Sequence, residues 1–263
     1  MDLHLDSKTA FISGSTQGIG FAIAKQLVKE GVSIILNGRN QQKLDLAIQS
    51  LQKEYPDSNI SGIVADFSNG DEVKVLIAAL PPVDILINNV GIFELKSFGT
   101  ITDAEWTRFF EVNVMSGVRL SRALLPKMLD KNWGRVIFIS SESGINIPEN
   151  MIHYGMTKTA LLSISNGLAK LTKGSQVTVN TILGGPTYSD GVAEAIVQIA
   201  HAQNQDPEQL KAYISTSTNP TSLLQRFIEP EEIASLAVYL SSPLSIATNG
   251  ASLRADGGVL TGI

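Results

Sequence analysis

A tyrosine and a lysine four residues apart, Tyr154 and Lys158, are the side chains in this sequence best suited to moving a proton. Residues at positions i and i+4 share one face of a helix, so the lysine ammonium can lie near the phenol. A free phenol has a pKa of about 10, and a nearby cation favours its anion. A hydroxyl such as that of Ser141 could then steady the reacting oxygen. The same spacing also occurs in ordinary amphipathic helices, so the pair needs support from elsewhere in the chain.

A glycine-rich turn near the N-terminus supplies that support. A predicted strand, Thr9–Ser13, leads through the turn Gly14-Ser15-Thr16-Gln17-Gly18-Ile19-Gly20 into a predicted helix over Gly18–Glu30. Glycines let the backbone turn tightly and approach phosphates, and the free N–H groups of a helix start are donors for an anion. The order strand, turn and helix therefore indicates a site for a dinucleotide pyrophosphate. A glycine cluster is weak by itself, and a strand–helix connection without a ligand is the alternative.

The composition limits the class of protein. A chain of 263 residues with 43% apolar and 17% charged residues fits one globular α/β domain. The formal net charge of -5, without a basic block, argues against nucleic acid and anionic membrane as partners. The absence of cysteine and the scattered positions of the three histidines predict no metal site. No signal peptide or membrane-spanning stretch is recognisable, so we expect a cytoplasmic protein.

Apolar runs alternate with helical patterns along most of the chain. Several runs are continuously apolar, as expected for parallel strands covered on both faces. The predicted strands are Thr9–Ser13, Ser33–Asn37, Ser61–Ala65, Ile85–Asn88, Val136–Ser140, Thr178–Ile182 and Ala251–Arg254. The predicted helices are Gly18–Glu30, Gln41–Glu54, Asp71–Leu80, Asp103–Asp130, Ile152–Lys173 and Glu231–Leu240. This alternation predicts a single domain, residues 1–263, with a doubly wound parallel sheet of seven strands.

The segment from Thr187 to Phe227 interrupts the alternation. It contains no convincing strand, and two helices are predicted in it, Val192–Gln203 and Glu208–Thr216. Because it follows the carboxyl end of a strand, where ligands bind in open α/β sheets, we expect a substrate lid at about 187–227. A surface excursion that supports an oligomer contact is the alternative.

Further motifs follow the glycine-rich turn in a definite order. They are Asn88-Asn89-Val90-Gly91, Asn113, Ser141, Tyr154-x-x-x-Lys158 and the segment after Asn180. This ordered set resembles the short-chain dehydrogenase/reductase family over nearly the whole chain, and the separation from Tyr154 selects Ser141 over Ser140 and Ser143. The resemblance implies a three-layer Rossmann-type fold and an NAD(P)-dependent enzyme that oxidises alcohols or reduces carbonyls.

The resemblance also implies roles for four residues. Tyr154 would protonate the carbonyl oxygen as hydride arrives, or act as the base in reverse, and Ser141 would hydrogen-bond the same oxygen. Lys158 would bind the nicotinamide ribose and lower the pKa of Tyr154. Asn113 would hold a water that links Lys158 to solvent. A local hydrogen bond inside a helix is the alternative for Asn113.

A cofactor site is implied in the same way. Its residues are Gly14, Ser15, Thr16, Gly18, Ile19, Gly20, Arg39, Asp66, Phe67, Asn89, Gly91, Tyr154, Lys158, Gly185, Thr187 and Ser189. Asp66 resembles the partner of the adenine amine, although it could be only a turn cap. Relatives that prefer NAD have a carboxylate at the position of Gly38, whereas Arg39 can pair with a 2′-phosphate. We therefore expect NADP(H), with NAD(H) possible; a solvated loop residue is the alternative for Arg39.

Two positions depart from the family pattern. Gly184 replaces the usual proline, and Ser189 replaces the threonine that binds the nicotinamide carboxamide. Ser189 retains the hydroxyl, while Gly184 loosens the backbone of the loop. We expect weaker or lid-dependent binding of the carboxamide.

The residues expected around the substrate are mostly apolar: Phe93, Ser143, Ile145, Pro186 and Tyr188. They predict a moderately apolar small-molecule carbonyl or secondary alcohol. A 3-oxoacyl-[acyl-carrier-protein] reductase is the alternative, although the net acidic chain does not suit an acidic carrier protein. A non-catalytic NADP-sensing protein is less favoured because the Tyr and Lys are both retained.

Assembly is expected to be homo-oligomeric. By resemblance, the long predicted helices Asp103–Asp130 and Ile152–Lys173 would form the interfaces of a homodimer or homotetramer. Packing within one chain could also explain their apolar patterns.

Overall fold

A computed structural model describes residues 2–262 and contains one parallel seven-stranded sheet. The strands are β1 (Thr9–Ile12), β2 (Ser33–Gly38), β3 (Ile60–Val64), β4 (Ile85–Asn88), β5 (Gly134–Ser141), β6 (Val177–Gly184) and β7 (Ser252–Ala255). Their order is β3-β2-β1-β4-β5-β6-β7, so the direction of winding reverses between β1 and β4. The predicted doubly wound α/β fold is confirmed, and a ligand crevice belongs at this reversal.

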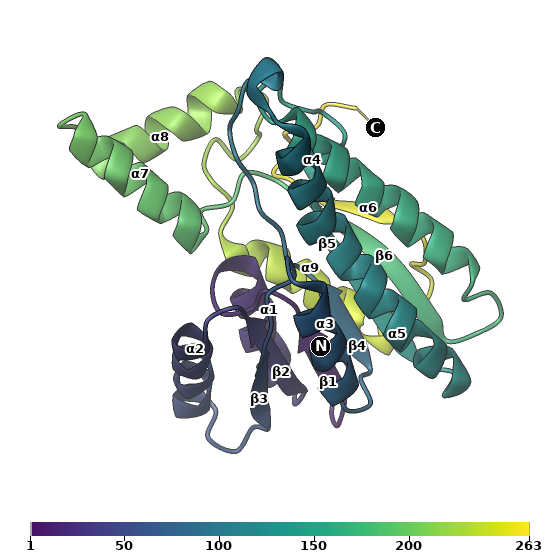
Figure 1. Cartoon of the computed structure of the whole chain (residues 1–263). Coiled ribbons are helices and arrows are strands. Elements are labelled where there is room, and N and C mark those ends of the chain that lie inside the picture. The colour runs from purple at the N-terminus through teal and green to yellow at the C-terminus, as the bar shows by residue number, and fades with distance from the viewer. Residues whose placement is uncertain (1, 263) are drawn as a thin grey trace.

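Helices cover both faces of the sheet (Figure 1). They are α1 (Gly18–Lys29), α2 (Gln41–Glu54), α3 (Gly70–Ala79), α4 (Asp103–Phe110), α5 (Ser116–Asp130), α6 (Ile152–Lys170), α7 (Asp190–Ala202), α8 (Pro207–Thr218) and α9 (Pro230–Ser241). Apolar side chains of α1, α2 and α9 share one core cluster, and those of α3, α5 and α6 share the other. Side chains of β1 alternate between these clusters, with Ile12 in the first and Phe11 in the second.

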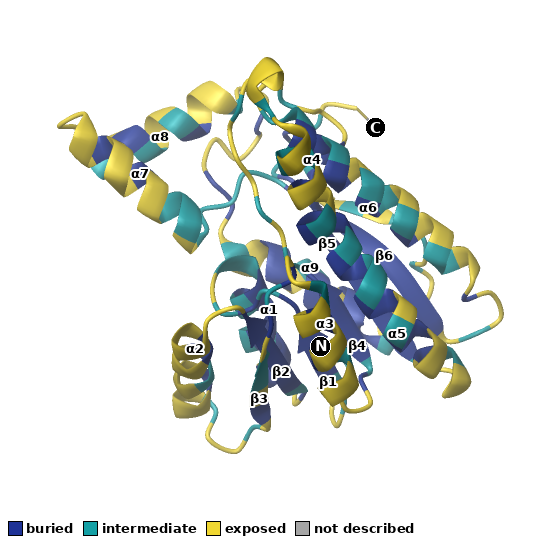
Figure 2. Cartoon of the chain, viewed as in Figure 1, coloured by how far each residue is buried: buried dark blue, intermediate teal, exposed yellow. Residues whose placement is uncertain are grey.

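The central strands are buried between these helical layers, while the edge strands β3 and β7 and the outer helix faces are partly exposed (Figure 2). All eight residues of β5 and all eight of β6 are buried, in agreement with the continuous apolar run Val136–Ile139 of β5. Within residues 2–262, no helix combines the length and apolar character needed to cross a membrane.

The single helix predicted over Asp103–Asp130 is wrong in its interior. A five-residue π-helical segment, Glu111–Met115, separates α4 from α5. The capping box of Thr102 and Glu105 starts α4 as the sequence indicates. The insertion has no sequence signal, and such π segments are frequent at functional sites. It contains Asn113.

The helices α7 and α8 form an antiparallel pair that projects beyond the carboxyl edge of the sheet (Figure 1). Both helices are near the positions that the sequence predicts. They pack through a small apolar cluster of their own, Ile196, Ala200, Leu210 and Phe227. The pair therefore has a separate core from the two clusters that flank the sheet.

Candidate active site

The tyrosine, lysine and serine of the predicted site meet where β5 ends and α6 begins. Ser141 is the last residue of β5, and Tyr154 and Lys158 occupy the first two turns of α6. The Lys158 Nζ lies 5.5 Å from the centre of the Tyr154 ring and donates a 3.0 Å hydrogen bond to the Ile139 carbonyl. A Cβ atom added to Gly91 would lie 3.4 Å from this Nζ, so the chain after β4 passes directly beside the lysine.

Burial dominates the electrostatics of this group. It raises the pKa of Tyr154, as does the Glu142 carboxylate, and the Ser141 hydroxyl opposes both only in part. Burial also lowers the pKa of Lys158 to about 8, although the Glu142 charge acts in the opposite direction. The net shift of the Tyr154 pKa in this structure is therefore upward, and the lowering expected from Lys158 stays a prediction for the enzyme with its cofactor. Desolvation and the nearby Glu142 carboxylate both disfavour the phenolate, and together they raise the pKa of Tyr154.

Asn113 connects three segments around the lysine. Its Nδ2 donates to the Ile92 carbonyl at 2.9 Å and to the Thr157 Oγ1 at 3.0 Å, and its Oδ1 accepts from the Ile92 N–H at 2.8 Å. The side chain is buried. The π-helical segment turns this amide toward the chain after β4 and toward α6, so Asn113 holds the surroundings of Lys158 in place.

The glycine-rich turn has the backbone geometry that its sequence predicts. Gly14 and Gly18 have φ values of 61° and 60°, in the region that favours glycine. A Cβ atom on Gly20 would lie 2.5 Å from the Asn89 Nδ2, which itself donates a 2.7 Å hydrogen bond to the Gly14 carbonyl. Asn89 therefore supports the turn from behind, and only glycine fits against it.

Two residues of the turn direct their side chains inward. The Ser15 Oγ donates to the Ile12 carbonyl at 2.7 Å and accepts from the Asn37 N–H at 3.0 Å, and the residue is fully buried. Ile19 packs against the apolar cluster under α1. Both were expected at the cofactor, but their side chains stabilise the turn, so any contact they make with a ligand is through the backbone.

The start of α1 already binds an anion from the same chain. The Gly18 N–H donates a 2.7 Å hydrogen bond to the Asp190 Oδ2 at the first residue of α7. Ser189 lies beside the same glycine, because an added Cβ atom on Gly18 would be 3.5 Å from the Ser189 Cβ. A carboxylate at this point demonstrates that the helix start accepts negatively charged oxygen, as a pyrophosphate site must.

A cavity of about 470 Å³ opens beside this turn, at the reversal of strand order. Seven of the expected cofactor residues line it: Gly14, Thr16, Arg39, Asp66, Phe67, Asn89 and Gly91. The sequence-based prediction missed Lys43 and Asn40, which also line it. The Asn40 side chain caps α2 by accepting from the Lys43 N–H at 3.0 Å. The sequence did offer a signal for these two residues: Asn40 is a typical helix cap directly after the second strand, and the cation Lys43 follows it by three residues.

The rim of this cavity at β2 carries two cations, Arg39 and Lys43, and a glycine, Gly38. Arg39 and Lys43 are both exposed at the cavity. A Cβ atom on Gly38 would lie 2.5 Å from the Thr16 Cγ2, so a larger residue at this position would displace Thr16.

Asp66 acts as a turn cap and also lines the cavity. Its Oδ1 accepts from the Ser68 N–H and from the Ser68 hydroxyl, each at 2.8 Å. Desolvation raises the pKa of Asp66, but these bonds and the charge of Arg39 outweigh it and hold that pKa below its usual value. Both interpretations from the sequence are therefore compatible with the geometry.

The chain after β6 is tightly held. A Cβ atom on Gly185 would lie 2.7 Å from the Asp256 backbone, so this glycine is required by close packing. The Thr187 Oγ1 donates to the Gly185 carbonyl at 2.8 Å, and the Ser189 N–H donates to the Thr187 carbonyl at 2.9 Å. The threonine hydroxyl is thus occupied within the loop.

The expected substrate residues fall into two groups. Phe93 meets the Tyr154 ring edge-on at 6.5 Å and is 56% exposed, and Ile145 is 54% exposed. Pro186 and Tyr188 are half-buried. The Tyr188 ring lies between Phe227 and the Lys211 ammonium, which is 3.7 Å from its centre, so this tyrosine packs within the α7–α8 region.

Glu142 belongs to the site and was missed. Its two carboxylate oxygens accept hydrogen bonds from the hydroxyls of Ser141 and Ser143. Ser143, expected at the substrate, is buried and directed toward this carboxylate. The only signal in the sequence was an acidic residue directly after Ser141.

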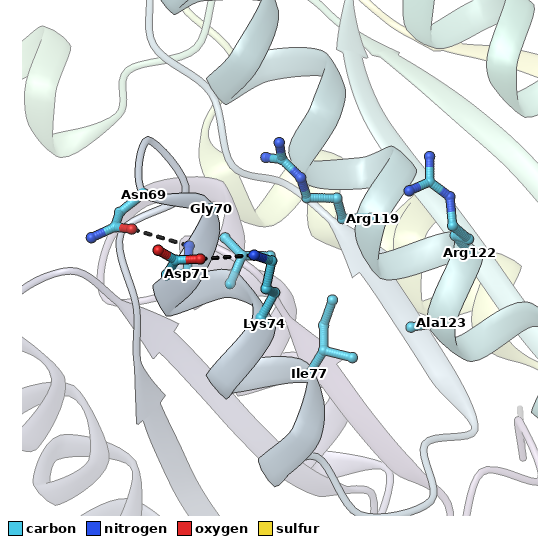
Figure 3. A pocket seen from close by; sticks show the side chains of 9 residues that line it. Asn69, Gly70, Asp71, Lys74, Ile77, Arg119, Arg122 and Ala123 are labelled. Carbon is cyan, nitrogen blue, oxygen red and sulfur yellow. Dashed lines mark hydrogen bonds and ion pairs between the residues drawn. The ribbon is translucent and has the colours of Figure 1, made fainter.

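A second cavity, also of about 470 Å³, lies between α3 and α5 (Figure 3). None of its lining residues belongs to the predicted site. Lys74 binds Asp71 at 2.8 Å across its lining, and Arg119 binds Glu111, which lies outside the lining. The cavity beside the glycine-rich turn is therefore the one relevant to chemistry.

Comparison with known proteins agrees with this geometry. A family model described as short chain dehydrogenase matches residues 8–199. The chain is 46% identical over all 263 residues to the whole of uncharacterized oxidoreductase YvaG of Bacillus subtilis (strain 168). It is 30% identical to the D-beta-hydroxybutyrate dehydrogenase of Rhizobium meliloti (strain 1021), with 96% of this chain and 98% of that protein aligned.

Among solved structures, L-sorbose reductase from Gluconobacter frateurii, complexed with NADPH and L-sorbose, superposes with a TM-score of 0.93. The two chains are 28% identical, and the whole of each is covered. The similarity extends through α7 and α8, so the entire described fold has a counterpart.

Proposed function

Since this chain belongs to the short-chain dehydrogenase family, whose members are oxidoreductases of alcohol and carbonyl groups, we propose that it is NADP(H)-dependent and acts on a moderately apolar small molecule. The observation that carries the proposal is the meeting of Ser141, Tyr154 and Lys158 at the carboxyl edge of the sheet. These groups lie next to Gly91, which lines the cavity beside the glycine-rich turn.

The cofactor fits this cavity through the chain's own groups. Gly14 and Gly18 form the turn that would hold the pyrophosphate, and Asp66 lies where an adenine amine could be bound. Arg39 and Lys43 would bind the 2′-phosphate. When bound, the nicotinamide supplies hydride for reduction and accepts it in oxidation. The NADPH complex of L-sorbose reductase supports the preference for NADP(H).

Tyr154 is the proposed proton donor. Its raised pKa keeps the phenol protonated at neutral pH, which is the form that protonates a carbonyl oxygen during reduction. Ser141 would donate a second hydrogen bond to the same oxygen. Lys158 retains its charge below about pH 8 and would stabilise the phenolate left behind. Through its hydrogen bonds to Ile92 and Thr157, Asn113 would hold the chain after β4 and α6 in position around these groups.

The segment at about 187–227 is the proposed lid. Its helices have a small core of their own, and Asp190 and Ser189 contact the start of α1. A unit with little shared core can move relative to the sheet at low cost. Closure would cover the exposed side chains of Phe93 and Ile145.

Assembly as a homodimer or homotetramer is part of the proposal. The long helices α5 and α6 lie on the same face of the sheet and present their outer surfaces side by side (Figure 1). Light scattering of the purified protein tests this, and a monomer at micromolar concentration would contradict it.

The proposed reaction is tested by following NADPH absorbance with a panel of aliphatic ketones, hydroxyketones and 3-oxoacyl thioesters. Small carbonyl compounds should be reduced with a higher kcat/KM than the thioesters. Binding of NADPH without reduction of any panel member would favour a cofactor-sensing protein instead.

A further inference from the structure

Glu142 is a carboxylate in the reaction centre that the proposed proton transfer does not use. It follows Ser141 directly, and a short 3₁₀ turn over Glu142–Gly144 holds its backbone. The Ile145 N–H closes this turn by donating to the Glu142 carbonyl at 2.9 Å. The side chain is half-buried, so its charge is neither fully solvated nor removed from the site.

Glu142 accepts the hydrogen bond that the Ser141 hydroxyl could otherwise donate to a substrate. A serine hydroxyl has one proton, and Ser141 donates it to the Glu142 Oε2. A carbonyl oxygen can only accept hydrogen bonds, so it must compete with the carboxylate for that proton. A plain ketone would therefore leave one carboxylate oxygen without its donor, at a cost typical of a broken charged hydrogen bond.

A substrate with its own donor removes this conflict. A hydroxyl on the carbon next to the carbonyl could donate to Glu142 and free the Ser141 proton for the carbonyl oxygen. A carboxylate at the same place would instead face the negative charge of Glu142. The field of Glu142 already reaches the centre, because it raises the pKa of both Tyr154 and Lys158.

We propose that Glu142 selects neutral α-hydroxyketones, and the corresponding vicinal diols in the oxidative direction, and disfavours 2-oxo acids. The inference rests on the proposed function and adds the substrate class to it. In reduction the carbonyl carbon gains hydride from NADPH and the oxygen gains the Tyr154 proton, which solvent replaces, so the products are a diol and NADP⁺. Phe93 and Ile145, both largely exposed, can cover the remaining carbons.

Three compounds of one shape test the proposal: 1-hydroxy-2-butanone, 3-pentanone and 2-oxobutanoate. They differ in whether the carbon next to the carbonyl carries a hydroxyl, a methyl group or the two oxygens of a carboxylate. The kcat/KM of the unmodified enzyme should be highest for the hydroxyketone and lowest for the oxo acid. Glu142→Gln should reduce the preference for hydroxyketone over ketone, and for hydroxyketone over oxo acid, each by about tenfold.

The exposed Glu149→Gln, in the same loop, is the matched control and should leave both ratios unchanged. Ratios in Glu142→Gln within about twofold of the unmodified enzyme would overturn the assignment while leaving the proposed reductase intact.

Selection of the substrate can also be tested without turnover. Isothermal titration calorimetry would measure the binding of the three compounds to the NADPH complex of Tyr154→Phe. The hydroxyketone should bind tightest, and Glu142→Gln in that background should remove the preference. Equal binding of all three overturns the inference about Glu142. Failure of the unmodified enzyme to reduce any carbonyl overturns the proposed function instead.

Discussion

The Gly18 N–H and the Asp190 carboxylate, 172 residues apart in the chain, are joined by a 2.7 Å hydrogen bond. This bond connects the start of α1 to the start of α7, and it uses one of the N–H groups that a cofactor pyrophosphate requires. The phosphate and the carboxylate cannot both accept this proton comfortably, since both are anions. A pyrophosphate bound at this turn, as proposed above, would therefore displace Asp190.

Asp190→Asn should strengthen NADPH binding. Removing one negative charge within a few ångströms of the pyrophosphate relieves a repulsion of about 1 kcal/mol, or roughly fivefold in Kd. Fluorescence titration with NADPH measures the effect. Glu194→Gln, an exposed change on the same helix, is the control. Weaker binding in Asp190→Asn would show instead that the carboxylate helps to hold the cofactor.

Tyr154→Phe should abolish turnover and leave NADPH binding nearly intact. The phenol is the only group proposed to deliver the proton, whereas the ring itself packs edge-on against Phe93 and is retained. Loss of an acid–base group lowers kcat by about 100-fold or more. Absorbance assays and fluorescence titration provide the two readouts, with the exposed Tyr239→Phe as control. Retained activity would remove Tyr154 from the mechanism.

Arg39→Ala should weaken NADPH binding by about tenfold to a hundredfold and NADH binding much less. The expected loss is that of a hydrogen bond to a charged group, about 1.5–3 kcal/mol, and only NADPH has the 2′-phosphate. Lys43→Ala should act in the same direction, and Lys53→Ala, on the exposed end of α2, should have no effect. Equal losses for both cofactors would contradict the 2′-phosphate site.

Lys158→Met should stabilise the cofactor-free protein at pH 7 while removing activity. Burial lowers the folded-state pKa of Lys158 from 10.5 to about 8, so the charged form is disfavoured in the folded chain. The unfolded chain binds more protons between these two values, so the penalty is complete below pH 8 and absent above pH 10.5. Allowing for the lost bond to Ile139, the gain at pH 7 is about 2 kcal/mol.

Denaturant titrations from pH 7 to pH 10.5 should show this gain shrinking as pH rises. Lys170→Met, at the exposed end of α6, should show no such trend. A gain that does not change with pH would mean that Lys158 is destabilising for reasons other than its charge.

Local pattern was enough for much of the fold. The local sequence patterns predict the observed limits of β4 and α2, Ile85–Asn88 and Gln41–Glu54. The i and i+4 spacing is sufficient to place Tyr154 and Lys158 on one helix face. These features depend on residues that are close together in the sequence, and the periodicity of the sequence reflects such local contacts directly.

Other features were decided only when distant segments packed together. In the π-helical segment, the Asn113 amide bonds Ile92 and Thr157, which belong to two other parts of the chain. The inward Ser15 hydroxyl depends on β2, and the Asp190 contact depends on how α7 docks.

The sequence by itself therefore determined most of the helices and strands, the doubly wound fold and the placement of Tyr154 and Lys158 on one helix. The tertiary structure decided which charges surround that pair. Burial and the Glu142 carboxylate, neither visible in residue spacing, raise the pKa of Tyr154 against the direction expected from Lys158. The physical reason is that a pKa depends on desolvation and on charges from every packed segment, whereas spacing encodes only local geometry.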